Sequence, residues 1–208
     1  DLVTMAVNKE GAALEFVDDS LKKDKDIVMK AISNDGGAIQ FADDSFKKDR
    51  EFVIQAIKSF LPIASGNALE FVDQSFQKDK TIVRLATEVC GFSFKYADES
   101  LKKDRSMVMM AVKEDGENLQ YAAASFKKDK EIVIAALNNR VDVLKYADQS
   151  LKDDPDIIKL LKSGIVTKHN IHRHPIFGGF NTYTGQVKND KPHGRGKMRN
   201  NQGSSYNG

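Results

Sequence analysis

The feature that most constrains this fold is an internal repeat with a period of 25 residues. Serine and aspartate recur four residues apart, at Ser20 and Asp24, Ser45 and Asp49, Ser75 and Asp79, Ser100 and Asp104, Ser125 and Asp129, and Ser150 and Asp154. An aromatic residue keeps the same register, at Phe16, Phe41, Phe71, Tyr96, Tyr121 and Tyr146. One gap is 30 residues, because five extra residues follow Ile57. A fixed period of this length is typical of proteins in which one small unit stacks on the next.

Each repeat is predicted to form two short helices. After the recurring aspartate, apolar residues at i, i+1, i+4 and i+5, from Ile27 to Ile32 in one repeat, lie on one face of a helix. Aspartate is a preferred N-cap, and Pro155 directly after Asp154 suits the first helical turn. Residues 14–21 carry apolar side chains at helical spacing and predict the second helix.

Helices of about 8 to 10 residues do not persist alone in water, so neighbouring repeats must pack together. The sequence therefore predicts a mainly α fold, an α-solenoid of helix-loop-helix repeats of about 25 residues. We interpret the recurring serines as small residues packed between layers. Solenoids normally end in polar capping repeats, and at this level neither end of the array resembles one.

The repeat unit, as in LKYADQSLKDDPDIIKLL at residues 144–161, resembles the DUF4116 repeat. The resemblance covers residues 1 to about 163 and implies the helical array. The family is named for having no known function, so the resemblance implies no activity. This sequence departs from the pattern at Ala123, where the other repeats have an acid, and at Val141, where most have glycine.

A module of different composition begins at Ile165, where the period stops. Residues 165–208 hold seven of the fourteen glycines and all four histidines. They carry seven basic residues against Asp190, a net charge of +6, whereas the rest of the chain has 25 basic and 29 acidic residues, a net charge of −4. We predict a repeat array over residues 1–163, with the insertion near 58–66, a linker over 164–180 and a C-terminal module over 181–208.

The C-terminal module is predicted to be a small β-hairpin. Its tyrosine, glycine and histidine pattern, which starts again at Tyr206, consists of Tyr183, Gly185, His193, Gly194 and Gly196. This pattern resembles a MORN repeat, whose units are hairpins stacked into an elongated sheet. The family has often been linked to phospholipids, so the resemblance implies attachment to anionic lipid. The basic residues that would supply the charge are Lys188, Lys191, Arg195, Lys197 and Arg199.

Charge and cysteine content limit the partners and the setting. The net charge of the whole chain is +2, which provides no general field toward nucleic acid, so a nucleic-acid partner is not expected. A single cysteine, Cys90, forbids a disulfide within the chain and favours an intracellular setting; we expect it to be buried as a small apolar residue. No run of apolar residues is long enough to cross a membrane, so we expect a soluble or peripherally attached protein.

We expect no enzyme activity, no cofactor and no metal site in these residues. No phosphate loop or catalytic triad spacing is present, and acidic runs such as residues 18–26 lack the central glycine and final glutamate of a calcium loop. His169, His172 and His174 have no further ligand to complete a tetrahedral set, and we assign them to a polar linker. Lysines recur in pairs, at 22–23, 47–48, 102–103 and 127–128. Two interpretations stay open: they form a solvated surface, or they form a regular row of positive charge, a basic ladder, that binds acidic partners.

The repetition explains the insertion least well. Phe60, Leu61 and Ile63 make it more apolar than a solvated loop needs, so it either contacts a partner or folds back on its own layer. We hypothesise a non-catalytic scaffold or assembly subunit that binds other proteins through its repeats, with these three residues as anchors. The alternatives are a tether to membranes or anionic surfaces through the basic module, and a targeting module of a larger enzyme.

Overall fold

The computed structural model describes residues 2–59 and 67–162 in full, and the backbone of residues 166–171, 181–188, 191–199 and 205–207. It is mainly helical, with many short helices, and it divides into two compact units, Asp1–Leu101 and Lys102–Gly208.

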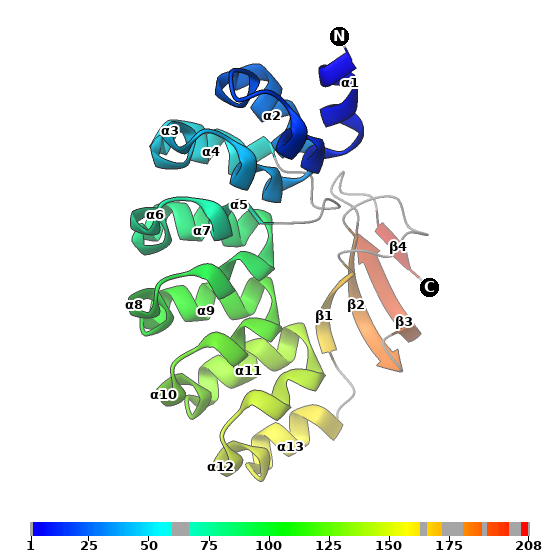
Figure 1. Cartoon of the computed structure of the whole chain (residues 1–208). Coiled ribbons are helices and arrows are strands. Elements are labelled where there is room, and N and C mark those ends of the chain that lie inside the picture. Colours follow the sequence, from blue (N-terminus) through cyan, green and yellow to red (C-terminus); the bar gives the residue numbers. More distant parts are fainter. Residues whose placement is uncertain are drawn as a thin grey trace. The chain divides into compact units, whose positions relative to one another are not determined.

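The helices of the first unit follow one repeating order: a 3-10 helix or a short α-helix, a second short helix, then a longer α-helix (Figure 1). They are α1 (Leu2–Lys9), η1 (Gly11–Phe16), η2 (Leu21–Lys23), α2 (Lys25–Asn34), η3 (Gly36–Phe41), α3 (Asp44–Lys48), α4 (Arg50–Ser59), α5 (Ala68–Phe71), α6 (Gln74–Lys78), α7 (Lys80–Val89), η4 (Gly91–Tyr96) and α8 (Glu99–Lys102), the last of which reaches the division between the units. We call each group of three such helices a layer.

The second unit continues the same order and then changes to strands. Its helices are α9 (Arg105–Glu114), η5 (Gly116–Tyr121), α10 (Ala124–Lys127), α11 (Lys130–Asn139), η6 (Val141–Tyr146), α12 (Gln149–Lys152) and α13 (Pro155–Lys162). The strands β1 (Val166–Ile171), β2 (Asn181–Lys188), β3 (Lys191–Arg199) and β4 (Ser205–Asn207) pair antiparallel in the order β1-β2-β3-β4.

The longer helices begin directly after the recurring aspartates, as predicted. In α2, Asp24 accepts hydrogen bonds from the backbone amides of Asp26 and Ile27, which satisfies two donors at the helix start. The apolar face predicted from the spacing is the core: Val28, Ala31 and Ile32 are fully buried. The equivalent residues of α4, α7, α9 and α11 are buried in the same way.

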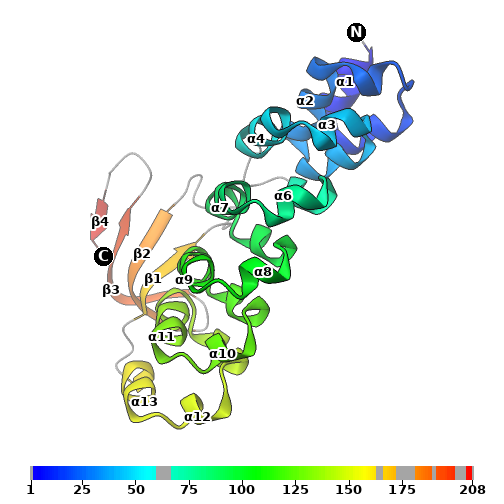
Figure 2. The same cartoon turned by 90° about the vertical axis from the view of Figure 1, so that its left-hand side faces the viewer.

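The prediction of two helices per repeat is wrong, because the second predicted helix is broken into two. In the second repeat, η3 ends at Phe41 and Ala42 has extended backbone angles, with φ −71° and ψ 159°. Asp43 then starts α3 by accepting a hydrogen bond from the backbone amide of Ser45. The break does not depend on the carboxylate, because Ala122 has the same extended angles before Ala123, which has no side-chain cap. Where an aspartate is present, its side chain stabilises the start of the new helix. In both units the short helices, such as α3 and α6 or α10 and α12, lie to one side of the longer ones (Figures 1 and 2).

Candidate functional site

A cap built from aspartate and serine recurs at the start of the short helices. In α3, the Ser45 hydroxyl donates to Asp43 at 2.6 Å, and the Ser45 amide donates to the same oxygen at 3.0 Å. These two bonds, with the hydroxyl bond the larger cause, lower the pKa of Asp43 below its ordinary value of 3.8. The same pair forms at Asp18 and Ser20, Asp73 and Ser75, Asp98 and Ser100, and Asp148 and Ser150. Interpreting the serines as packing between layers is therefore wrong: these serines are exposed and complete a local cap.

Neighbouring layers within each unit are joined by a regular backbone hydrogen bond. The amide of the capping residue donates to a carbonyl of the preceding layer, as from Asp43 to Lys22 at 3.1 Å. The equivalent bonds run from Asp73 to Lys47, Asp98 to Gln77, Ala123 to Lys102 and Asp148 to Lys127. Because this bond needs no particular side chain, it survives at Ala123, where the capping acid is lost.

Basic side chains bridge several layers to the acids of the next layer. The residue after a capping aspartate reaches the capping aspartate of the following layer, as from Arg50 to Asp79 at 3.1 Å and from Lys130 to Asp154 at 2.9 Å. A lysine two positions earlier reaches the short-helix cap, as from Lys128 to Asp148 at 3.8 Å. Lys23 makes the same contact with Asp43 at 3.9 Å, so two of the paired lysines, Lys23 and Lys128, have interlayer partners within the protein itself. Each exposed ion pair contributes little stability, about 0 to 1 kcal/mol.

Glycine lets a 3-10 helix lie directly against the backbone of the longer helix of its layer. A Cβ atom on Gly116 would lie 2.6 Å from the carbonyl oxygen of Ala136, and one on Gly11 would lie 2.5 Å from that of Ala31. The Gly116 amide donates to Asn139 Oδ1 at 3.0 Å. The Asn139 side-chain amide donates in turn to backbone carbonyls at the end of α9, which ties two layers together.

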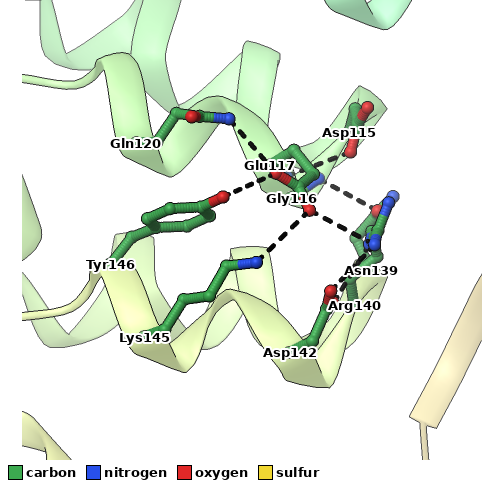
Figure 3. Close-up of polar contacts among 9 residues, drawn as sticks. All are labelled: Asp115, Gly116, Glu117, Gln120, Asn139, Arg140, Asp142, Lys145 and Tyr146. Atoms are coloured by element: carbon green, nitrogen blue, oxygen red, sulfur yellow. Dashed lines mark hydrogen bonds and ion pairs between the residues drawn. The ribbon is translucent and has the colours of Figure 1, made fainter.

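The densest polar cluster of the described residues lies between η5 and η6 and centres on the Glu117 carboxylate (Figure 3). Glu117 accepts a hydrogen bond from the Tyr146 hydroxyl at 2.9 Å and one from Gln120 Nε2 at 3.1 Å. Its other oxygen lies 3.2 Å from a guanidinium nitrogen of Arg140 and 4.0 Å from Lys145 Nζ. Only 15% of the Glu117 side chain is exposed, so two hydrogen bonds and two cations hold a carboxylate that is largely shielded from water.

Two further carboxylates complete this cluster. Asp142 binds Arg140 through both oxygens, at 2.8 and 3.1 Å, and this pairing lowers the pKa of Asp142. Asp115 accepts the backbone amide of Glu117 at 3.0 Å, and burial raises the pKa of Asp115. With both lysine and arginine engaged by carboxylates, the arrangement joins two layers and presents no activated nucleophile.

A second group of side chains lies on the first short helix of each layer, which carries the aromatic residue of the repeat and is a 3-10 helix in every layer except that of α5. The aromatic side chains from Phe41 to Tyr146 are half-buried, and Phe16 is 84% exposed. Lysine lies over two of the rings, with Lys95 Nζ 4.4 Å from the centre of Tyr96 and Lys145 Nζ 4.7 Å from that of Tyr146. Phe92, which is 46% exposed, adds an apolar side chain to η4.

The structure places the residues singled out from the sequence as follows. Asp24, Asp49, Asp79, Asp104, Asp129 and Asp154 each accept backbone amides at the start of a longer helix. Phe60, Leu61 and Ile63 lie outside the described residues, as do the side chains of Lys188, Lys191, Arg195, Lys197 and Arg199. Tyr183, Gly185, His193, Gly194 and Gly196 lie in β2 and β3, where Gly185 pairs with Gly196. Cys90 is the C-cap of α7 and is half-buried, whereas the sequence predicted a buried residue.

Sequence reasoning missed the Glu117 cluster. Its signal is a departure from the repeat, because the position of Glu117 is occupied by Gly37, Asn67, Phe92 and Asp142 in other repeats. A residue that recurs is visible in the period, whereas a residue such as Glu117, which occurs at its position in one repeat, is not.

The described part of the chain has neither a bilayer-spanning helix nor a metal-binding group of side chains. None of its helices combines the length and the apolar character needed to cross a bilayer. In the same residues, no three histidine, cysteine, aspartate or glutamate side chains gather closely enough to hold a metal ion.

The recurring caps, interlayer bonds and buried helix faces define a helical repeat protein. More particularly, the chain belongs to the DUF4116 family, described as a domain of unknown function, whose matches cover residues 1–40, 26–62, 63–102 and 104–152. No curated protein and no solved structure matches the chain. The family matches end at residue 152, and the MORN resemblance of residues 181–208 stays a prediction.

Proposed function

We propose that this protein is a non-catalytic scaffold whose α-solenoid of repeats binds other proteins within a larger assembly. The observation that carries the proposal is a division between constant and variable positions. The side chains at recurring positions form hydrogen bonds within the protein, as in the cap of Asp43 and Ser45. A constant framework with variable surface residues is how repeat proteins present extended binding surfaces.

The variable positions lie at the first short helix of each layer, which is a 3-10 helix in every layer except that of α5. One position carries Gly37, Asn67, Phe92, Glu117 and Asp142 in successive repeats. Three residues further on, the side chain is exposed in most repeats and varies in charge: Glu15, Gln40, Glu70, Lys95, Gln120 and Lys145. The recurring aromatic residue directly follows each of these residues in the sequence. Aromatic anchors next to variable charges are typical of protein-binding surfaces, in which a few residues provide most of the affinity.

The experiment has two stages. Crosslinking mass spectrometry on the tagged protein, isolated with its native companions at moderate salt, identifies a partner and the lysines that face it. The affinity of that partner is then measured for Phe92→Ser with Lys145→Glu, and separately for Phe60, Leu61 and Ile63 all changed to Ser. We expect at least one of these variants to weaken binding about tenfold or more.

The matched control is Lys30→Glu, which changes an exposed lysine on the longer helix α2 and none of the variable positions. It should bind the partner as the unchanged protein does. If every variant keeps full affinity, or if all crosslinks are intramolecular, the scaffold proposal is wrong.

The charge of the C-terminal module favours a second candidate, attachment to anionic membranes or surfaces. Residues 165–208 carry a net charge of +6 against −4 for the rest of the chain. Polybasic segments gain about 1 kcal/mol per basic residue near an anionic bilayer. Flotation of the full chain with vesicles tests this: binding should need anionic lipid and should be lost when Lys188, Lys191, Arg195, Lys197 and Arg199 are changed to Glu. Absence of binding at low salt rules the candidate out.

A further inference from the structure

The last helical layer, η6 with α12 and α13, differs from the earlier layers at the positions that face a following layer. In the layer before it, Lys128 and Lys130 reach forward to Asp148 and Asp154 of the last layer. One repeat further on, these two positions are Asp153 and Pro155. Two forward-facing cations are therefore replaced by one anion and one uncharged residue, so the attraction to another capping acid is lost.

A third difference lies in the apolar core. One core position near the end of the longer helix is apolar or threonine in every earlier layer: Val7, Ile32, Ile57, Thr87, Val112 and Leu137, all of them buried. In α13 this position is Lys162, which is exposed. Earlier helices such as α9 and α11 pack against the 3-10 helix that follows them, whereas the described segment after α13 is the strand β1. An unpaired lysine is costly to bury, so it opposes the same packing after α13.

The three differences act in the same direction. We propose that η6, α12 and α13 form a capping layer, in which Asp153, Pro155 and Lys162 end the stack and reject a further repeat. Terminal repeats with a polar outer face are what keep a repeat array from exposing its apolar interface. This revises, for the C-terminal side, the expectation that neither end of the array is capped.

A tandem duplication tests the proposal in the full chain. A second copy of residues 138–162 is inserted directly after Lys162. Asp148 and Asp154 of the inserted copy would then face positions 153 and 155 of the original last layer. The same insertion is made in a chain with Asp153→Lys, Pro155→Arg and Lys162→Leu, which copies the forward-facing chemistry of Lys128, Lys130 and Leu137. Limited proteolysis is followed by the masses of the complementary fragments, which separate cuts in the inserted copy from cuts in the original layer.

We expect the inserted copy to be cut readily in the unchanged background, because it has no layer to pack on. In the triple variant the inserted copy should be cut at least about tenfold more slowly, because the rate of proteolysis follows the population of the open form. Equal rates in the two backgrounds, whether both fast or both slow, overturn the proposal. The triple variant without the insertion is the folding control, and its helical circular dichroism and melting temperature should match those of the unchanged chain.

Discussion

Ala123 provides a test of the cap chemistry, because it is the one short-helix cap among the described residues 18–148 that lacks an acid. The backbone of Ala123 still has extended angles, with φ −55° and ψ 151°, but no side chain caps α10. Ser125, two residues on, keeps the position that bonds the carboxylate elsewhere. Ala123→Asp should therefore restore the two bonds seen at Asp43, at 2.6 and 3.0 Å.

Replacing alanine with aspartate at an N-cap is worth about 1 kcal/mol, within a range of about 0.5 to 2. For a chain of this size, this corresponds to a rise in melting temperature of about 2 to 4 °C. Ala124→Asp is the control, since it adds the same charge one residue later, where it can act only on the helix dipole, for less than about 1 kcal/mol. Calorimetry at neutral pH should rank Ala123→Asp above Ala124→Asp, with the unchanged chain lowest.

The pH dependence makes this test more specific. Because the cap lowers the folded pKa of the capping aspartates Asp43, Asp73 and Asp148 below the ordinary 3.8, their stabilisation is present above the unfolded pKa. It is lost as the pH falls through the folded pKa. The gain from Ala123→Asp should disappear in the same way on acidification, whereas Ala123→Asn, which caps without a charge, should keep its gain. A gain from the aspartate that persists well below pH 3.8 would refute the cap reasoning.

Three further changes test the contacts around η5. Gly116→Ala places a Cβ atom 2.6 Å from the Ala136 carbonyl oxygen, so the free energy of unfolding should fall by about 1 to 3 kcal/mol; an unchanged urea midpoint would mean that α11 moves aside at no cost. Tyr146→Phe removes the bond to Glu117 and should cost about 1 kcal/mol, and a double-mutant cycle with Glu117→Gln should show coupling; additive effects contradict the pairing. Asp115→Asn keeps an acceptor for the Glu117 amide, and because burial raises the folded pKa of Asp115, its charged form destabilises the fold above that pKa. Asp115→Asn should be more stable than the unchanged chain at pH 7 and lose this advantage below pH 3.8. If the variant and the unchanged chain have equal unfolding midpoints at both pH values, the burial argument is contradicted.

The longer helices could be predicted from the sequence because two independent signals agree on each of them. In α2, Asp24 marks the start and the buried face from Ile27 to Ile32 follows at helical spacing. The segment between two longer helices could not be predicted in the same way. Its apolar residues also have helical spacing, yet the chain turns between the two short helices in every repeat, even at Ala123, where no carboxylate caps α10, and the spacing does not reveal that turn.

The serines show why a recurring residue does not reveal its own role. Ser45 recurs beside apolar positions, which fits packing as well as capping, and only the 2.6 Å contact with Asp43 separates the two. The Glu117 cluster was missed for the opposite reason. Its members meet across two repeats, from Glu117 to Tyr146, and a contact 29 residues apart in the sequence has no local signal.

The two kinds of contact between layers have different roles. Exposed ion pairs such as that of Lys130 with Asp154 contribute about 0 to 1 kcal/mol each, whereas full burial of an aliphatic side chain such as Val133 contributes about 1.5 to 3 kcal/mol. Burial therefore holds the layers together, but apolar faces that are alike in every layer do not distinguish one neighbour from another. The charges supply that distinction, since a forward-facing cation fits a capping acid and Asp153 does not. On this argument, weak pairs such as those of Arg50, Arg105 and Lys130 determine which surface a layer accepts, and the array ends where both the charges and the apolar position at Lys162 change together.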